Sequence, residues 1–100
     1  MPQFRTEVTH SLGKQPATER LMRFIDRVRQ QYADQVSDVE GQWRDHIMTF
    51  SITTYGFTIS GTLTVSDDRV DVQGRLPLAA LPFRGKIEQA IGAELQRELS

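Results

Sequence analysis

The feature that most constrains the fold is a change of hydrophobic period part-way along the chain. Between residues 21 and 36, apolar residues recur at spacings of three and four, which places them on one side of a helix. From Val39 onward, apolar and polar residues alternate over residues 39–76, the pattern of strands with one buried face. This switch predicts an α+β fold, in which helices cover one face of an antiparallel sheet.

The first part of the chain predicts a strand and a long helix. Residues 4–9 alternate and are expected to form the strand, and a turn follows at residues 10–13. Pro16 suits a first helical position, because its missing N–H has no intrahelical partner there. The expected apolar stripe of the helix consists of Leu21, Phe24, Ile25, Val28, Tyr32 and Val36.

The alternating region accommodates four strands with reversals at residues 44–46, 55–56 and 66–68. Short reversals imply antiparallel neighbours, and therefore a meander. The expected buried positions are Val39, Gly41, Trp43, Met48, Phe50, Ile52, Phe57, Ile59, Gly61, Leu63, Val65, Val70, Val72, Gly74 and Leu76. The opposite face carries Thr58, Ser60, Thr62 and Thr64, and either stays exposed or packs against a second copy in a homodimer.

The last element is a second helix that begins at Pro82. Its expected apolar stripe consists of Phe83, Ile87, Ala90, Ile91, Leu95 and Leu99. The predicted order is therefore β-α-β-β-β-β-α, with two helices packed on one face of the meander in a helix-grip-like arrangement. With 100 residues, the chain has room for one core, so residues 1–100 are expected to form a single domain.

Composition narrows the classes of partner and of chemistry. The chain has no cysteine, which excludes disulfides and thiolate metal sites, and it has no apolar run long enough to span a membrane. We expect a cytoplasmic protein without a transmembrane segment. Because the net charge is −1, nucleic acid is an improbable partner for the molecule as a whole, and an anionic partner requires a local patch.

No residue pattern indicates catalysis. His10 and His46 lie in different predicted loops, and three or four converging ligands would be needed for a metal. Ser11 lacks the Gly-x-Ser-x-Gly frame of a nucleophile elbow. Gly56 and Gly61 precede no Lys-Ser/Thr pair, so they do not form a phosphate-binding loop. We therefore expect neither an enzyme nor a cofactor.

Arg20, Arg23 and Arg27 share one side of the first helix and are candidate binding residues for phosphates of nucleic acid or lipid. Glu19 and Asp26 lie one turn away from Arg23, which favours an ordinary solvated helix face.

Two aromatic residues are further candidates for binding. Trp43 in a strand and Tyr55 in a turn could each anchor a partner or a hydrophobic polymer, because aromatic side chains carry much of the energy of such contacts. For Trp43, filling the core is the favoured interpretation.

Several segments resemble the polyhydroxyalkanoic acid system proteins, a family of small bacterial proteins. They are His-Ser-Leu-Gly at 10–13, residues 43–50, Gly-Phe-Thr-Ile-Ser-Gly-Thr-Leu-Thr-Val at 56–65, Asp-Arg-Val at 68–70, Leu76 and the closing amphipathic helix. The resemblance covers nearly the whole chain, with a departure at Pro77 and residues 78–80. It implies a noncatalytic accessory protein of polyhydroxyalkanoate metabolism that binds the granule surface, granule proteins or an acyl ligand.

Two other functions stay open. The helix-grip likeness to START-like lipid-binding proteins suggests a small hydrophobic-ligand carrier or enzyme, with a pocket lined by Ile87, Ile91, Phe50 and Leu63. Because the chain is short, we expect its apolar side chains to be used up in the core, with none left over for a chamber. The third function is a nucleic-acid-binding module that uses the arginine-rich helix face.

Overall fold

The computed structural model describes residues 3–31, 34, 36–54 and 56–100, with only the backbone at residues 36–39 and 54. The elements are β1 (Gln3–Thr9), α1 (Lys14–Gln31), β2 (Val36–Arg44), β3 (Ile47–Thr54), β4 (Phe57–Val65), β5 (Arg69–Arg75), a 3₁₀ segment η1 (Leu78–Phe83) and α2 (Arg84–Leu99). This order confirms the predicted α+β class and the β-α-β-β-β-β-α sequence of elements.

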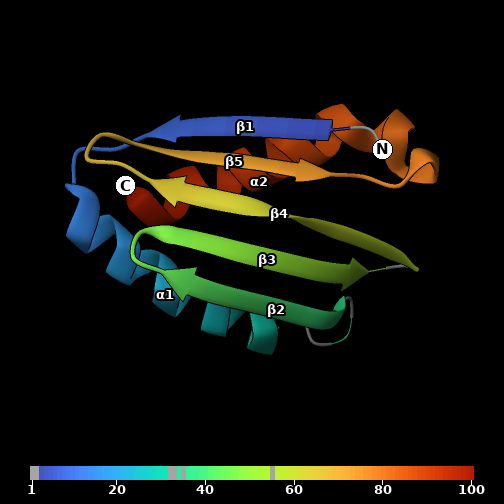
Figure 1. Cartoon of the computed structure of the whole chain (residues 1–100), viewed down its shortest axis with the longest axis horizontal. Coiled ribbons are helices and arrows are strands. Elements are labelled where there is room, and N and C mark those ends of the chain that lie inside the picture. The colour runs from blue at the N-terminus through green and yellow to red at the C-terminus, as the bar shows by residue number, and fades with distance from the viewer. Residues whose placement is uncertain (1–2, 32–33, 35, 55) are drawn as a thin grey trace.

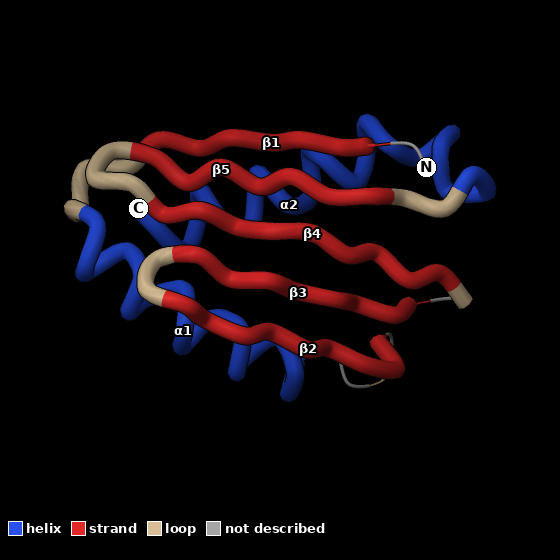
Figure 2. The backbone as a smooth tube through the Cα atoms, viewed as in Figure 1, coloured by secondary structure: helices blue, strands red, loops and turns tan. Residues whose placement is uncertain are grey.

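The five strands form one antiparallel sheet in the order β1-β5-β4-β3-β2. Strands β2 to β5 make the predicted meander, and β1 adds to the edge of β5 (Figure 1). Both helices lie behind the sheet on the same face, as Figure 2 shows, and none of the described residues forms a helix on the other face. None of the helices in the described part of the chain is long and apolar enough to cross a membrane.

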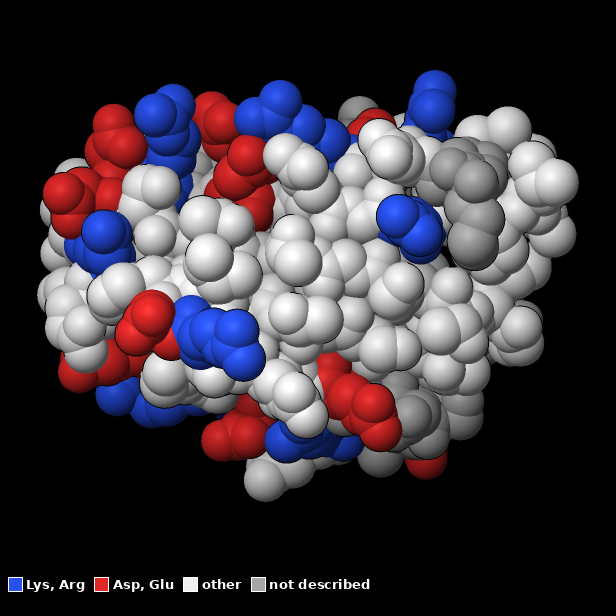
Figure 3. Space-filling view, viewed as in Figure 1, with Lys and Arg blue, Asp and Glu red and all other residues white. Residues whose placement is uncertain are grey.

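The core lies between the inner face of the sheet and the two helices. Its buried apolar residues are Phe4, Val8, Ala17, Leu21, Met48, Phe50, Leu63, Val65, Val70, Val72, Leu76, Ala80, Leu95 and Leu99. On the outer face, Thr58, Ser60 and Thr62 are exposed, and uncharged side chains fill much of the centre of that face (Figure 3). The alternation therefore assigned the two faces of these strands correctly.

Two side chains of α2 bond to the free edge of β1. The carboxylate of Glu88 accepts a hydrogen bond from the backbone N–H of Arg5 at 2.8 Å, and the side-chain amide of Gln96 donates to the carbonyl of Thr9 at 3.4 Å. An unpaired strand edge is a template for aggregation, and these side chains occupy part of it.

Helix α1 begins two residues earlier than predicted, at Lys14 instead of Pro16. Gly13, with a φ of +88°, makes the turn, and its carbonyl accepts the N–H of Ala17 at 3.2 Å. Pro16 is tolerated in the first turn, because the N–H groups there have no partner within the helix. The helix also ends earlier: Val36 belongs to β2, and Tyr32 lies outside the described residues.

The start of the last helix was also predicted wrongly. Pro82 lies inside η1, and α2 begins at Arg84. The carbonyl of Pro77 accepts the N–H of Ala80 at 2.9 Å, which winds the chain into a tight turn with Ala80 buried. As a result, Phe83 leaves the buried stripe and is 51% exposed.

Candidate ligand-binding cleft

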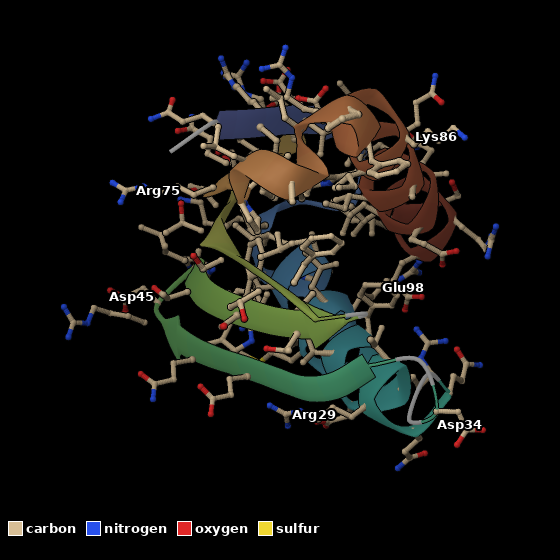
Figure 4. The ribbon with its side chains drawn as sticks, turned by 90° about the vertical axis from the view of Figure 1, so that its right-hand side faces the viewer. Arg29, Asp34, Asp45, Arg75, Lys86 and Glu98 are labelled. Atoms are coloured by element: carbon tan, nitrogen blue, oxygen red, sulfur yellow. The ribbon has the colours of Figure 1, made fainter. Side chains whose placement is uncertain are left out.

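Helices α1 and α2 run close together at one end of the sheet and diverge toward the other (Figures 1 and 2). At the close end, the guanidinium of Arg20 donates to the carbonyls of Glu98 at 3.3 Å and Ser100 at 3.1 Å. The guanidinium of Arg27 forms an ion pair with the Glu98 side chain, which lies between the two helices in Figure 4.

A cleft of about 400 Å³ lies between α1, α2 and the inner face of the sheet. Its apolar lining consists of Phe24, Ile25 and Val28 from α1, Ala90, Ile91 and Leu95 from α2, and Met48, Phe50, Ile52, Leu63 and Val72 from the sheet. Helices in contact pack about 8–10 Å apart, so diverging helices leave part of the apolar face between them uncovered. The expectation that no apolar side chains are left over for such a space is therefore wrong.

The charged lining residues, Glu40 and Glu94, are both acidic. Glu40 is exposed and pairs with Ser51, which places its side chain on the outer face of the sheet, so the carboxylate on the cleft side is that of Glu94. Glu94 is half-buried and accepts hydrogen bonds from Arg97 at 3.2 and 3.3 Å. No lysine, arginine or histidine belongs to the described lining of the cleft. A ligand with its own carboxylate would meet the like charge of Glu94 at this site, whereas a neutral apolar chain would not.

A second hollow, of about 890 Å³, lies around the contact between Gly61 and Gly74 and has a more polar lining. One of its cations, Arg5, is already paired with Asp71 at 3.0 Å. The hydrogen bond with Asp71 raises the pKa of Arg5 above its ordinary value, against the smaller effect of desolvation. Because this hollow combines strand backbone with mixed charges, it offers less to an apolar ligand than the cleft does.

The structure places the three candidate arginines in different surroundings. Arg20 and Arg27 contact the end of α2, while Arg23 is exposed and forms no hydrogen bond or ion pair with a described residue. The hydrogen bond with Glu98 raises the pKa of Arg27 above its ordinary value, against the opposing effect of desolvation. Two of the three guanidinium groups therefore join the helices, and a phosphate would have to compete for them.

Of the two aromatic candidates for binding, the structure describes only Trp43. Trp43 is half-buried, pairs with Met48 across the β2–β3 ladder and packs against the core, which agrees with the favoured core-filling interpretation. Tyr55 lies outside the described residues.

The imidazole rings of both histidines contact residues that are distant in the sequence. The Nδ1 atom of His10 accepts the N–H of Leu12 at 3.2 Å, and its Nε2 lies 3.0 Å from the carbonyl oxygen of Ser66. His46 Nδ1 lies 2.9 Å from the hydroxyl of Thr18, which donates to the carbonyl of Lys14 at 2.8 Å. Within the described ranges, no three acidic or histidine side chains are grouped to hold a metal.

Replacing the buried Thr18 by valine is expected to lower the free energy of unfolding by about 1–2 kcal/mol, because His46 loses its partner inside the protein. Denaturant titration measures the change. Thr62→Val is the control: this threonine is exposed in a strand, and its replacement is expected to change stability by less than about 0.5 kcal/mol. Equal losses in both variants would contradict a structural role for the Thr18–His46 pair.

Comparison with known protein families shows which family the chain belongs to. The family model of the polyhydroxyalkanoic acid system proteins matches residues 5–99. The chain belongs to this family. No curated protein and no solved structure matches it. The matched range of the polyhydroxyalkanoic acid system family includes every residue that lines the cleft, and the family name links the chain to polyhydroxyalkanoate systems.

The sequence pointed to part of the cleft. Three of the four residues expected around a pocket, Phe50, Leu63 and Ile91, do line it, whereas Ile87 packs against the core instead. The lining residues of α1 belonged to the predicted stripe, but nothing in their spacing indicated that they remain partly uncovered. Glu94, which lies outside the predicted apolar stripe of the last helix, also lines the cleft.

Proposed function

We propose that this protein is a noncatalytic, cytoplasmic accessory protein of polyhydroxyalkanoate systems, and that its cleft binds neutral hydroxyalkanoate chains. The observation that carries the proposal is the apolar space of about 400 Å³ between α1, α2 and the sheet. Small-molecule sites commonly have volumes of roughly 300–1,000 Å³ and largely apolar walls with few polar groups. The family name supplies the class of ligand.

The charges of the cleft favour an esterified chain over a free acid. Along a polyhydroxyalkanoate, each carboxyl group is joined to the next hydroxyl as an ester, so the interior of the chain carries no charge. Such a segment can lie beside Glu94 without repulsion between carboxylates. The unit expected in the cleft is therefore a short stretch of ester-linked hydroxyalkanoate, with its alkyl groups against the apolar walls.

The lining also supports a binding role without catalysis. Its described residues include no hydroxyl, thiol or imidazole group, the usual nucleophiles and bases of ester cleavage. The carboxylate of Glu94 is already engaged by Arg97.

The test compares two alanines on α2. Ala90 lines the cleft and Ala93 does not, and both are exposed, so phenylalanine can be introduced at either position without entering the core. Ala90→Phe is expected to weaken binding of a methyl-ester dimer of 3-hydroxydecanoate at least about tenfold, because the ring occupies ligand space. Ala93→Phe should bind like the unmodified protein.

Calorimetry measures both dissociation constants, and fluorescence of Trp43, the single tryptophan, gives a second readout close to Met48 in the cleft lining. Absence of binding to the unmodified protein, or equal weakening by the two substitutions, would overturn the proposal.

A further inference from the structure

Large apolar side chains are concentrated on the surface of η1. Leu78 is 76% exposed, Phe83 51% and Leu81 39%, and Ala79 and Pro82 are exposed as well. Apart from Met22 and Ile47, these are the exposed large hydrophobic residues in the described part of the chain. A contiguous exposed apolar patch of this kind marks an interaction site more often than scattered single residues do.

Three basic residues lie near the exposed apolar side chains of η1, which we call the apolar tip. Arg75 lies at the end of β5, and Arg84 and Lys86 lie in the first turn of α2; all three are exposed. Figure 4 looks onto η1 from its end of the molecule, with Arg75 to one side and Lys86 to the other. Residues 75–86 contain no Asp or Glu, and none of the three cations forms an ion pair with another described residue.

We infer that η1 is an interfacial anchor that inserts its apolar side chains into an anionic phospholipid surface. Apolar side chains enter the boundary between headgroups and acyl chains, while neighbouring lysines and arginines contact the anionic headgroups. The three cations therefore favour an anionic lipid surface as the partner of η1. A second copy of the chain, docked by the same tip, would bring two sets of these cations together, which like-charge repulsion opposes.

The anchor is separate from the proposed ligand cleft, since none of the residues 75–86 belongs to the described lining of that cleft. The two sites would work together if the anchor brings the protein to a lipid-coated surface where apolar chains are available to the cleft. A negative result for ligand binding in the cleft would not affect the inference about the anchor, and the reverse also holds. The Ala90→Phe variant, which blocks the cleft, is therefore expected to bind lipid normally.

The test uses the whole protein and co-sedimentation with vesicles. Binding is expected to vesicles of phosphatidylcholine mixed with phosphatidylglycerol, to weaken as salt is raised, and to fall at least about tenfold on vesicles of phosphatidylcholine alone. Arg84→Gln and Lys86→Gln should each weaken binding about fivefold, the equivalent of about 1 kcal/mol for one basic residue near an anionic surface.

The double variant Leu78→Ser/Phe83→Ser should abolish sedimentation while the circular dichroism spectrum stays unchanged, because both side chains are exposed. Ile47→Ser, an exposed apolar residue on β3, is the matched control and should bind as before. Failure of the unmodified protein to sediment with the anionic vesicles, or equal loss with Ile47→Ser, would overturn the inference. The inference would also be overturned if the Leu78→Ser/Phe83→Ser variant changed its oligomeric state but still bound lipid like the unmodified protein. The apolar surface of η1 would then be a contact between copies of the protein.

Discussion

Gly74→Ala is expected to lose at least about 3 kcal/mol of unfolding free energy, or to fail to fold, because a methyl group has no space at this position. A Cβ atom there would lie 2.5 Å from the carbonyl oxygen of Ser60 and would overlap the ring of Phe4. Gly74 pairs with Gly61 across the β4–β5 ladder, and a Cβ on Gly61 would lie 2.7 Å from the Cα of Gly74. Since small domains are stable by only about 5–15 kcal/mol, either substitution removes a large share of the total.

Gly85→Ala is the matched control. This glycine lies in α2, and a Cβ atom there would meet nothing within 4 Å. Alanine is the better helix former, so the variant is expected to gain about 0.5–1 kcal/mol in a denaturant titration. A Gly74→Ala protein as stable as the original would show that strands β4 and β5 do not approach as closely as described.

The second large effect concerns the length of the ligand. Affinity for methyl esters of straight-chain acids is expected to rise about fourfold with each added methylene, because each one buried in the cleft contributes about 0.8 kcal/mol. Between the four-carbon and ten-carbon esters the dissociation constant should fall by about three and a half orders of magnitude, and the gain should end once the cleft of about 400 Å³ is filled. Calorimetry across the series measures this slope.

Charge provides the control within the same series. The free ten-carbon acid should bind more weakly than its methyl ester at neutral pH, because its carboxylate meets that of Glu94. Glu94→Gln is expected to narrow this difference in affinity by removing that negative charge. An affinity that does not depend on chain length, or a tighter complex with the free acid, would show that the cleft is not a site for neutral alkyl chains.

The fold could be predicted from sequence where a single periodicity covered a whole element. Residues 57–65 alternate without interruption, because one face of β4 is against the core and the other is in water, and the predicted bounds of that strand were confirmed. Element ends were less predictable. Proline at position 16 is compatible with several places in a first turn, and the contact between the N–H of Lys14 and Asp67 that helps to start α1 comes from a distant loop.

The candidate site could be predicted only in part, because periodicity reports which residues are apolar but not which are covered. Phe50 and Leu63 were expected near a pocket, yet the divergence of α1 and α2 that opens the cleft depends on helix packing. Phe83 fitted the apolar stripe of the last helix by its spacing. The 3₁₀ turn that exposes it is set by Pro77 and Pro82, whose effect on the start of α2 the stripe did not reveal.

The place of β1 in the sheet has a consequence for how the chain folds. Thr9 pairs with Arg69, 60 residues later, so β1 has no partner in the sheet until β5 has been made. The hairpins of the β2–β5 meander join neighbours in sequence and close short loops at a small entropic cost, whereas docking β1 closes a loop that includes most of the chain. The edge of β5 therefore stays unpaired until β1 docks on it, and the side chains of α2 that occupy part of the outer edge of β1 are made last of all.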